Sequence, residues 1–193
     1  MCGRFTLTTA DYDAVAAALE AEIDPEASAR YRPRFNVAPT DPHPMLVPGD
    51  ARARRLVWGT WGIVPPPRPG ARPGLQINAR AEGVTRGYIG SAFKRHRCAV
   101  VADGFYEWTG PKTARRPIRF TPKGGGLLVF AAVWLPQKDK KSGEQSPHFA
   151  ILTTEANELV RSVHDRMPVI LSDIDEWLQP GDAPEQLAGL QSL

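Results

Sequence analysis

The sequence predicts a single α+β domain in which a curved, mainly antiparallel β-sheet forms a barrel-like core with short helices around it. Three strand-like segments, residues 118–121, 127–135 and 148–153, follow one another and are separated by glycine-rich or polar loops. Such a succession is typical of a meander that curves and closes. The chain has 193 residues, of which 42% are hydrophobic, enough for one core. We expect this domain to span residues 1–178 and a short acidic tail to follow at residues 179–193.

The first half of the chain alternates strand-like segments with proline-rich loops. Residues 2–7 predict a strand, and the Thr and Asp residues that follow predict the start of a helix with apolar Val15, Leu19 and Ile23. Residues 35–40 indicate an extended, sharply turned loop. Two short strands are expected at residues 45–47 and 54–58, and a Pro/Gly-rich loop that can move is expected between residues 65 and 74.

Residues 77–82 place three polar side chains, Asn78, Arg80 and Glu82, at alternate positions. If the backbone is extended, all three point to one face, as at a strand end that displays a site. If it is helical, they spread around the axis. The sequence alone leaves both conformations open.

The second half of the chain continues with a helix expected at residues 88–97 and a buried strand at residues 98–101, ahead of the three meander strands. Thr154 is expected to cap a helix that runs to Val163. A last strand is expected at residues 169–171 and a helical turn at residues 173–178.

The cysteine content and the apolar pattern indicate the compartment. The two cysteines, Cys2 and Cys98, make no disulfide framework, which is typical of a reducing environment. The first 13 residues hold no apolar signal-peptide core, and the longest apolar run is too short to cross a bilayer. We expect a soluble, monomeric, cytoplasmic protein with no membrane partner.

Arginine dominates the positive charge. The formal net charge is +3, but residues 172–193 hold five acids and no Lys or Arg, so the preceding body carries 24 minus 16, or +8. The planar guanidinium suits phosphate, so the clusters suggest a nucleic-acid surface. Substitution of Arg for Lys in a GC-rich genome is the competing explanation. The clusters lie at residues 30–34, 52–55, 94–97 and 115–119.

Cys2 is the first candidate for chemistry. Removal of Met1 by an aminopeptidase, which a small second residue permits, would leave an α-amine and a thiol on adjacent carbons. The ordinary pKa values of the two groups lie near 8, so a useful fraction of each is nucleophilic at neutral pH. An aldehyde would form a Schiff base with the amine, and the thiolate would then close a five-membered ring. The competing interpretation is a small hydrophobic residue at the start of an edge strand.

Two further residues are candidates for proton transfer. Glu107 follows a buried strand and lies among large aromatic residues, where partial desolvation would raise its pKa towards values useful in acid–base catalysis. A solvated acid at a strand edge is the alternative. His164 precedes a proline-terminated turn and titrates near neutrality, although a lone histidine is more often structural. We find no metal-ligand spacing and no nucleotide fingerprint, so we expect no metal and no cofactor.

Five separated stretches, taken together, resemble the SRAP family, the SOS-response-associated peptidases. They are Met1-Cys2-Gly3-Arg4-Phe5, Trp61-Gly62-Ile63-Val64-Pro65, Asn78-Ala79-Arg80-Ala81-Glu82, Gly104-Phe105-Tyr106-Glu107-Trp108 and His164-Asp165-Arg166-Met167-Pro168. The resemblance covers nearly the whole chain. It implies a DNA-damage-response protein that binds single-stranded DNA and crosslinks itself, through a thiazolidine, to the ring-opened aldehyde of an abasic site. Such a protein would be associated with the nucleoid when it is bound to DNA.

The resemblance also implies a role for each motif residue. Cys2 would be the nucleophile, Asn78 would hold the terminus or the sugar, and Glu107 and His164 would move protons. The implied DNA-binding residues are Arg4 and Arg80 as phosphate contacts, and Trp61 and Pro39 as an apolar wedge that splays the strand and stacks on bases. Trp58 lies close enough to Trp61 in sequence to take the wedge position instead.

Two other functions stay open at this stage. A cysteine peptidase would use Cys2 and His164, with Glu107 or Asn78 as the orienting group, and removal of Met1 would be its self-processing reaction. A non-catalytic single-stranded-DNA-binding module would use only the arginine clusters. A covalent adduct with an aldehyde-bearing oligonucleotide separates the first function from both.

Overall fold

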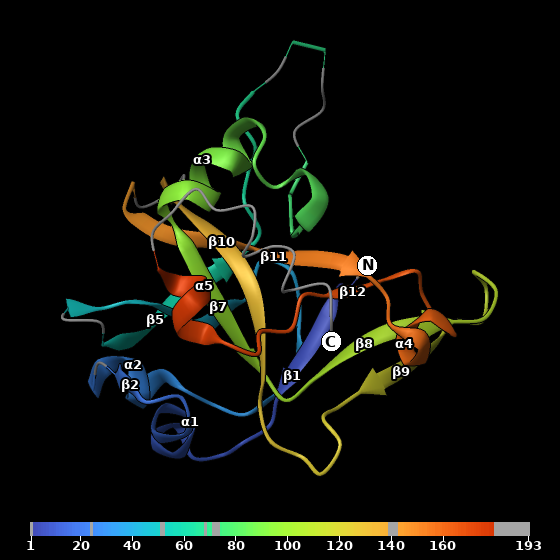
Figure 1. Cartoon of the computed structure of the whole chain (residues 1–193), viewed down its shortest axis with the longest axis horizontal. Helices are drawn as coiled ribbons and strands as arrows, with labels where there is room; N and C mark the ends of the chain where they lie inside the picture. Colours follow the sequence, from blue (N-terminus) through green and yellow to red (C-terminus); the bar gives the residue numbers. More distant parts are fainter. Residues whose placement is uncertain are drawn as a thin grey trace.

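The protein, described here by a computed structural model, is a single-domain α+β fold around a small β-barrel, which confirms the predicted fold class (Figure 1). The structure describes residues 2–23, 25–50, 53–67, 69–70, 74–138 and 143–179. Much of the Pro/Gly-rich loop before Gly74 and nearly all of the expected acidic tail lie outside these residues. Within them, no helix is long and apolar enough to cross a membrane.

The barrel consists of five strands. In order around it, β11, β10, β7, β4 and β5 pair antiparallel, and parallel pairing of β11 with β5, at His148 opposite Thr60 and Phe149 opposite Trp61, closes the ring. Closure removes the free strand edges, which are otherwise a liability for a sheet. The five strands are β4 (Pro42–Pro48), β5 (Arg54–Trp61), β7 (Arg97–Ala102), β10 (Leu128–Lys138) and β11 (Gln145–Glu155).

Three short strands extend this sheet. β6 (Asn78–Arg80) pairs parallel with β11, and β12 (Arg166–Pro168) pairs antiparallel with it. β2 (Ala21–Ile23) pairs parallel with β5. The sequence left open whether residues 77–82 are extended or helical. The backbone is extended through β6 and then turns into a 3-10 helix at Ala81–Gly83.

A second, four-stranded sheet packs against the barrel. Its strand order is β3 (Arg34–Val37), β1 (Arg4–Leu7), β8 (Gly104–Thr109) and β9 (Arg116–Phe120). Its inner face joins the barrel in a buried cluster that includes Phe5, Phe105 and Phe130. The first strand of the chain, β1, is thus a central strand of this sheet and packs on the barrel through Phe5.

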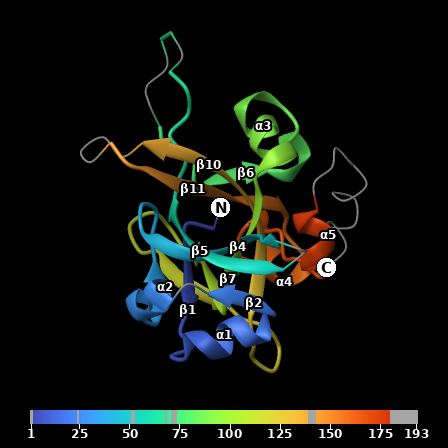
Figure 2. The same ribbon diagram turned by 90° about the vertical axis from the view of Figure 1, so that its left-hand side faces the viewer.

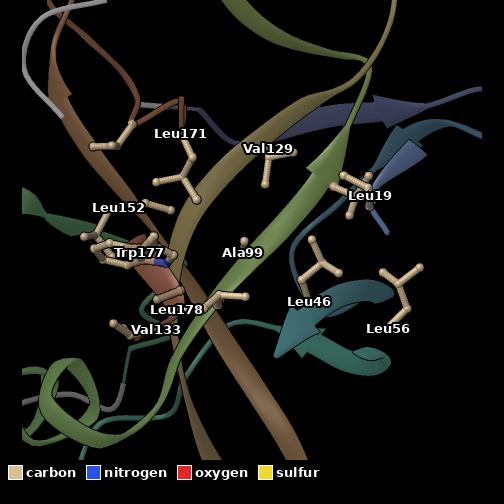
Figure 3. Packing of buried hydrophobic residues seen from close by; sticks show 14 of the residues in the cluster. Leu19, Leu46, Leu56, Ala99, Val129, Val133, Leu152, Leu171, Trp177 and Leu178 are labelled. Atoms are coloured by element: carbon tan, nitrogen blue, oxygen red, sulfur yellow. The ribbon is translucent and has the colours of Figure 1, made fainter. Parts of the chain in front are cut away.

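Short helices cover the ends of the molecule. α1 (Tyr12–Ala18), capped by Asp11, and α2 (Pro25–Arg30) lie at one end, and α3 (Gly87–Arg95) lies at the other, as both views show (Figures 1 and 2). α5 (Ile174–Leu178) presses Trp177 into a core of aliphatic side chains, among them Val133 and Leu152 (Figure 3). The indole Nε1 of Trp177 donates to the Cys98 carbonyl at 2.7 Å.

Two predicted elements after the last long strand were wrong. β11 continues through Glu155, so Thr154 caps no helix; Asn157 caps α4 (Glu158–Arg161) instead, by accepting from the Val160 N–H at 3.0 Å. The last strand is β12, ahead of the predicted residues 169–171, where only Ile170 forms an isolated bridge. In both cases the cause is the pairing of β11 with β12. This pairing extends β11 past Thr154, and it places the last strand ahead of residues 169–171.

Trp177 predicts a large stability effect. We expect Trp177→Ala to lower the free energy of unfolding by about 3–5 kcal/mol, because it removes a large side chain that is 2% exposed and leaves a cavity. Urea unfolding measures the change. Leu159→Ala, at a side chain that is 67% exposed, is the control and should change stability by less than about 0.5 kcal/mol. Equal effects of the two changes would contradict the packing role of Trp177.

Candidate active site

Cys2 lies two residues before the start of β1 and is fully buried. Its carbonyl accepts a hydrogen bond from Nδ2 of Asn78 at 2.9 Å, and its Sγ donates to the Arg4 carbonyl at 3.5 Å. Burial, and secondarily the nearby Glu107 charge, raises the pKa of the Cys2 thiol above its ordinary value. The sulfur is therefore a neutral thiol at neutral pH, which corrects the expectation that a useful fraction of it is already thiolate.

Asn78 reaches Cys2 from β6. Parallel pairing of Asn78 with Ile151 of β11 fixes its backbone, and the Ile151 N–H donates to the Ile77 carbonyl at 3.0 Å. Its Oδ1 is buried and accepts no hydrogen bond within the described part of the chain. The carboxamide therefore holds the Cys2 backbone with its nitrogen and keeps an oxygen acceptor for another group.

Glu107 approaches the same segment from β8. The register that places Tyr106 opposite Arg4 brings the next residue, Glu107, alongside the Cys2–Gly3 segment. The side chain is 2% exposed, and this burial raises its pKa, although the nearby His164 opposes the shift. The predicted desolvation of Glu107 is confirmed, and its carboxyl can be protonated at a higher pH than an exposed one.

His164 follows α4 and lies close enough to Glu107 to affect its charge. The Nδ1 of His164 accepts from the Arg166 backbone N–H at 2.9 Å and also lies 2.9 Å from Oδ1 of Asp165. These contacts require different protonation states: the first needs a bare Nδ1, and the second needs a proton on it. We favour the first for the neutral ring, because a backbone N–H can only donate, whereas Asp165 is an exposed side chain.

An ion pair that the sequence analysis missed joins the two sides of the site. Arg166 donates from Nη1 and Nη2 to Oε1 and Oε2 of Glu82 at 2.7 and 2.9 Å, and Nη2 also donates to the Thr153 carbonyl. This pair, which we call the Arg166–Glu82 clamp, ties the chain after His164 to the turn after Asn78. Both residues lie in the motifs that carry the family resemblance, which is the signal that could have found them.

The two arginines assigned to phosphate are placed differently. Arg80 is exposed at the end of β6, beside a surface hollow that it lines with Arg161 and Arg166 and with the acids Glu155 and Asp165. Arg4 is half-buried, and its Nη1 donates to the Gly3 carbonyl at 2.7 Å. Arg80 is thus directly available to an anion, whereas Arg4 lies closer to the Cys2 segment.

Trp61 does not fit the predicted role of a wedge that stacks on bases. It is 0% exposed, its Nε1 donates to the Ile77 carbonyl at 2.9 Å, and its ring lies 4.9 Å from that of Phe5. Its backbone carbonyl accepts from the Thr40 N–H at 2.8 Å, so it supports the turn that carries half-buried Pro39. Trp58 packs against a different buried cluster from the one that contains Cys2, and the Arg30 guanidinium lies 5.4 Å from its ring centre.

Other aromatic side chains are accessible near the site. Tyr106 and Trp108 are half-buried, with ring centroids 6.4 Å apart, and strand alternation places both on the face of β8 opposite Glu107. Tyr106 is paired with Arg4 on one side and Arg119 on the other, so an arginine flanks it on each neighbouring strand. Phe35, on the edge strand β3, is 67% exposed. This outer face, and not Trp61, offers rings to a ligand.

The fold and the site together define a small β-barrel protein that gathers a cysteine, a carboxamide, a carboxyl group and an imidazole beside its first strand. Among the described residues, no group of three or more His, Cys, Asp or Glu side chains could hold a metal ion. The family model described as SOS response associated peptidase (SRAP) matches residues 1–193. The chain belongs to the SRAP family.

Several relatives support this assignment. The chain is 36% identical over 199 residues to the abasic site processing protein YoqW of Bacillus subtilis, with 98% of this chain and 86% of YoqW covered. It is 30% identical over 192 residues to the abasic site processing protein YedK of Escherichia coli, with coverages of 93% and 80%. A crystal structure of a Bacteroides thetaiotaomicron protein has the same fold, with a TM-score of 0.82 at 22% identity and coverages of 98% and 86%.

The Arg166–Glu82 clamp predicts a pH-dependent contribution to stability. We expect Glu82→Gln to lower the free energy of unfolding by about 1–3 kcal/mol near pH 7, towards the lower end because Glu82 is partly exposed. The hydrogen bonds from Arg166 lower the pKa of Glu82 below its ordinary value of 4.5. The contribution is therefore present above about pH 4.5 and is lost as the pH falls through the lowered value.

Denaturant unfolding of wild type and Glu82→Gln at about pH 7 and about pH 3 measures this effect. Glu155→Gln is the matched control, because Glu155 is 80% exposed and its ion pair with the exposed Arg161 is long, at 3.9 Å. We expect almost no change in that variant at either pH. A Glu82→Gln deficit that stayed the same at both pH values would show that it does not arise from the charge.

Proposed function

We propose that this protein binds abasic sites in single-stranded DNA and forms a covalent thiazolidine with them through Cys2, after Met1 is removed. The observation that carries the proposal is the convergence on Cys2 of the Asn78 carboxamide and a buried carboxyl, Glu107, with a raised pKa. That arrangement supplies an anchor for the backbone of the nucleophile and a proton donor beside it. The names of YoqW and YedK as abasic site processing proteins support the choice of substrate.

The chemistry proceeds in two bond-forming steps. The α-amine of Cys2 attacks the aldehyde carbon, and the resulting carbinolamine accepts one proton and loses one water molecule to give a protonated imine. Sγ then attacks the same carbon as the thiol gives up its proton, so one proton is taken up in the first step and one is released in the second. One C–N bond and one C–S bond form, one water is released, and nothing is oxidised or reduced, so the reaction needs neither a metal nor a cofactor.

The protonation states of the buried groups favour the amine as the first nucleophile. The thiol is neutral because its pKa is raised, and it needs a base before or during its attack. Protonated Glu107 can give its proton to the departing hydroxyl of the carbinolamine, and the carboxylate that remains can then accept the thiol proton. One carboxyl thus serves both steps and ends in its starting protonated state, with His164 near it.

The surface around the site suits a single strand. Arg4 and Arg80 provide positive charge on two sides of Cys2, and Tyr106 and Trp108 provide rings for unpaired bases. In this proposal Trp61 supports the turn at Pro39 from inside, and Pro39 alone retains the wedge role.

The family model carries the word peptidase in its description, but the surroundings of Cys2 disfavour the peptidase alternative. A cysteine peptidase uses a thiolate whose pKa is lowered by a neighbouring imidazolium, whereas burial and Glu107 raise the pKa of Cys2. The second alternative, a non-catalytic single-stranded-DNA-binding module, would give the buried Glu107 no chemical role. The crosslinking function gives a role to both Cys2 and Glu107.

Cys2 is tested by trapping the adduct. With an oligonucleotide that holds one abasic site, we expect wild type to give a complex that survives heat denaturation without any reductant. Cys2→Ser should give such a complex only when cyanoborohydride reduces the imine, because the hydroxyl forms no stable ring. Intact mass confirms the loss of Met1 in each protein.

Cys98→Ala is the matched control for Cys2→Ser. Cys98 is equally buried but lies on β7, where its carbonyl accepts from Trp177, and it should crosslink as wild type does. A fully stable adduct formed by Cys2→Ser without reductant would reject ring closure. If Cys98→Ala lost crosslinking and Cys2→Ser kept it, the nucleophile would be Cys98 and the assignment to Cys2 would be wrong.

The pH dependence tests Glu107. The rate should rise with pH as the α-amine, with an ordinary pKa near 8, becomes neutral. The rate should fall at higher pH as Glu107 loses its proton. Burial raises the pKa of Glu107 above the ordinary 4.5, so this loss occurs at a higher pH than in an exposed carboxyl group. Glu107→Gln should remove the falling limb and slow the reaction by about 10² or more. Single-turnover rates between about pH 5 and about pH 9 measure both effects, and an unchanged profile would exclude Glu107 from proton transfer.

A further inference from the structure

Three arginines that the active site does not use line one pocket at the far end of β1. The pocket, which we call the arginine pocket, is lined by Arg30, Arg32, Arg34, Tyr31, His43 and Trp58. Leu7, the last residue of β1, also lines it and lies five residues from Cys2, or about 17 Å along an extended strand. The arginine pocket is therefore separate from the chemistry at Cys2.

The positive charge of this pocket is only partly neutralised. Arg34 pairs with Asp41. Within the described part of the chain, neither Arg30 nor Arg32 pairs with a carboxylate; Arg32 donates to the Ala29 carbonyl at 3.0 Å, and the Arg30 guanidinium lies 5.4 Å from the centre of the Trp58 ring. Two guanidinium groups thus face the pocket without a counter-ion from a described side chain.

Apart from the arginines, the pocket is lined by three rings, Tyr31, His43 and Trp58, and by the apolar residues Leu7, Pro42 and Pro44. Nε1 of Trp58 donates to the Ala27 carbonyl at 3.3 Å, and the Tyr31 hydroxyl donates to the Thr9 carbonyl at 2.6 Å. Nε2 of His43 donates to the Val101 carbonyl at 2.7 Å, and burial lowers the pKa of His43 to about 4, so the ring is neutral. Hydrogen bonds to the backbone therefore fix the rings, and the arginines supply the charge.

We propose that the arginine pocket binds one nucleotide unit, with its phosphate on Arg30 and Arg32 and its base against Trp58. Guanidinium groups match phosphate oxygens in geometry and charge, and an indole offers a stacking surface to any base. Because Arg30 lies over the Trp58 ring, a phosphate that binds it holds the attached base beside the indole. Two sources supply such a unit: a free mononucleotide, or a nucleotide within a bound single strand.

The test uses the whole protein and undamaged ligands, so its outcome does not depend on crosslinking at Cys2. The probes are dAMP, deoxyadenosine, inorganic phosphate, and single-stranded oligonucleotides of about 6 and about 20 nucleotides, which bracket common binding-site sizes. The variant is Arg30→Ala with Arg32→Ala. The control is Lys94→Ala with Arg95→Ala, which removes the same charge from α3 at the opposite end of the molecule (Figure 2).

We expect dAMP to bind more tightly than deoxyadenosine or phosphate and to quench tryptophan fluorescence, with Trp58→Phe abolishing the quenching. The Arg30/Arg32 variant should weaken dAMP binding about tenfold or more, and the control should not. If the unit comes from a strand, the variant should also flatten the salt dependence of binding to the longer oligonucleotide by about 1.4 in log–log slope, or about 0.7 for each lost contact.

The outcomes separate the two sources and can reject both. Weaker dAMP binding with unchanged oligonucleotide binding identifies a free mononucleotide as the ligand. A flatter salt dependence for the longer oligonucleotide alone identifies a strand that extends from the active site. If the Arg30/Arg32 variant behaves like the Lys94/Arg95 control towards every probe, or if Trp58→Phe retains full quenching by a bound probe, the proposal is wrong.

Discussion

The arrangement of the site depends on the pairing of β11. This strand closes the barrel through β5, fixes Asn78 through β6, and receives the chain after His164 through β12. Asn78 and His164 are 86 residues apart in sequence, and two ladders on one strand bring their segments to the same end of the barrel. A closed barrel permits little relative movement of its strands, so it can hold these side chains in place without a large folded lid.

Burial gives the site its chemical character. A thiolate at Cys2 and a carboxylate at Glu107 would repel each other in a region with little access to water, and each group is shifted towards its neutral form. The site therefore favours at most one negative charge at a time. A reaction that starts with a neutral amine and moves one proton from Glu107 and back satisfies this constraint, whereas a thiolate-first reaction requires a charge that the surroundings oppose.

Features that depend on local sequence could be predicted, and those that depend on distant pairing could not. The strands near residues 2–7 and 98–101 follow from alternating or continuous apolar residues, and Glu107 among aromatic residues indicated a desolvated acid. The strand β8 that carries Glu107 was not predicted. The choice between Thr154 and Asn157 as a helix cap was not local, because both residue types cap helices and β12 decides where β11 ends. Likewise, the Arg166–Glu82 contact spans 84 residues, and nothing near either residue identifies its partner.

Trp61 shows why a motif residue need not touch the ligand. Its position in β5 takes part in barrel closure, its ring packs on Phe5 of β1, and its carbonyl supports the turn at Pro39. A large aromatic side chain in such a position stabilises three segments that surround Cys2, and exposing it to stack on a base would uncover much of that packing. The motifs therefore contain two kinds of residue. Cys2, Asn78, Glu107 and His164 gather at the site for which we propose the reaction, whereas Trp61, Glu82 and Arg166 hold the strands that carry them.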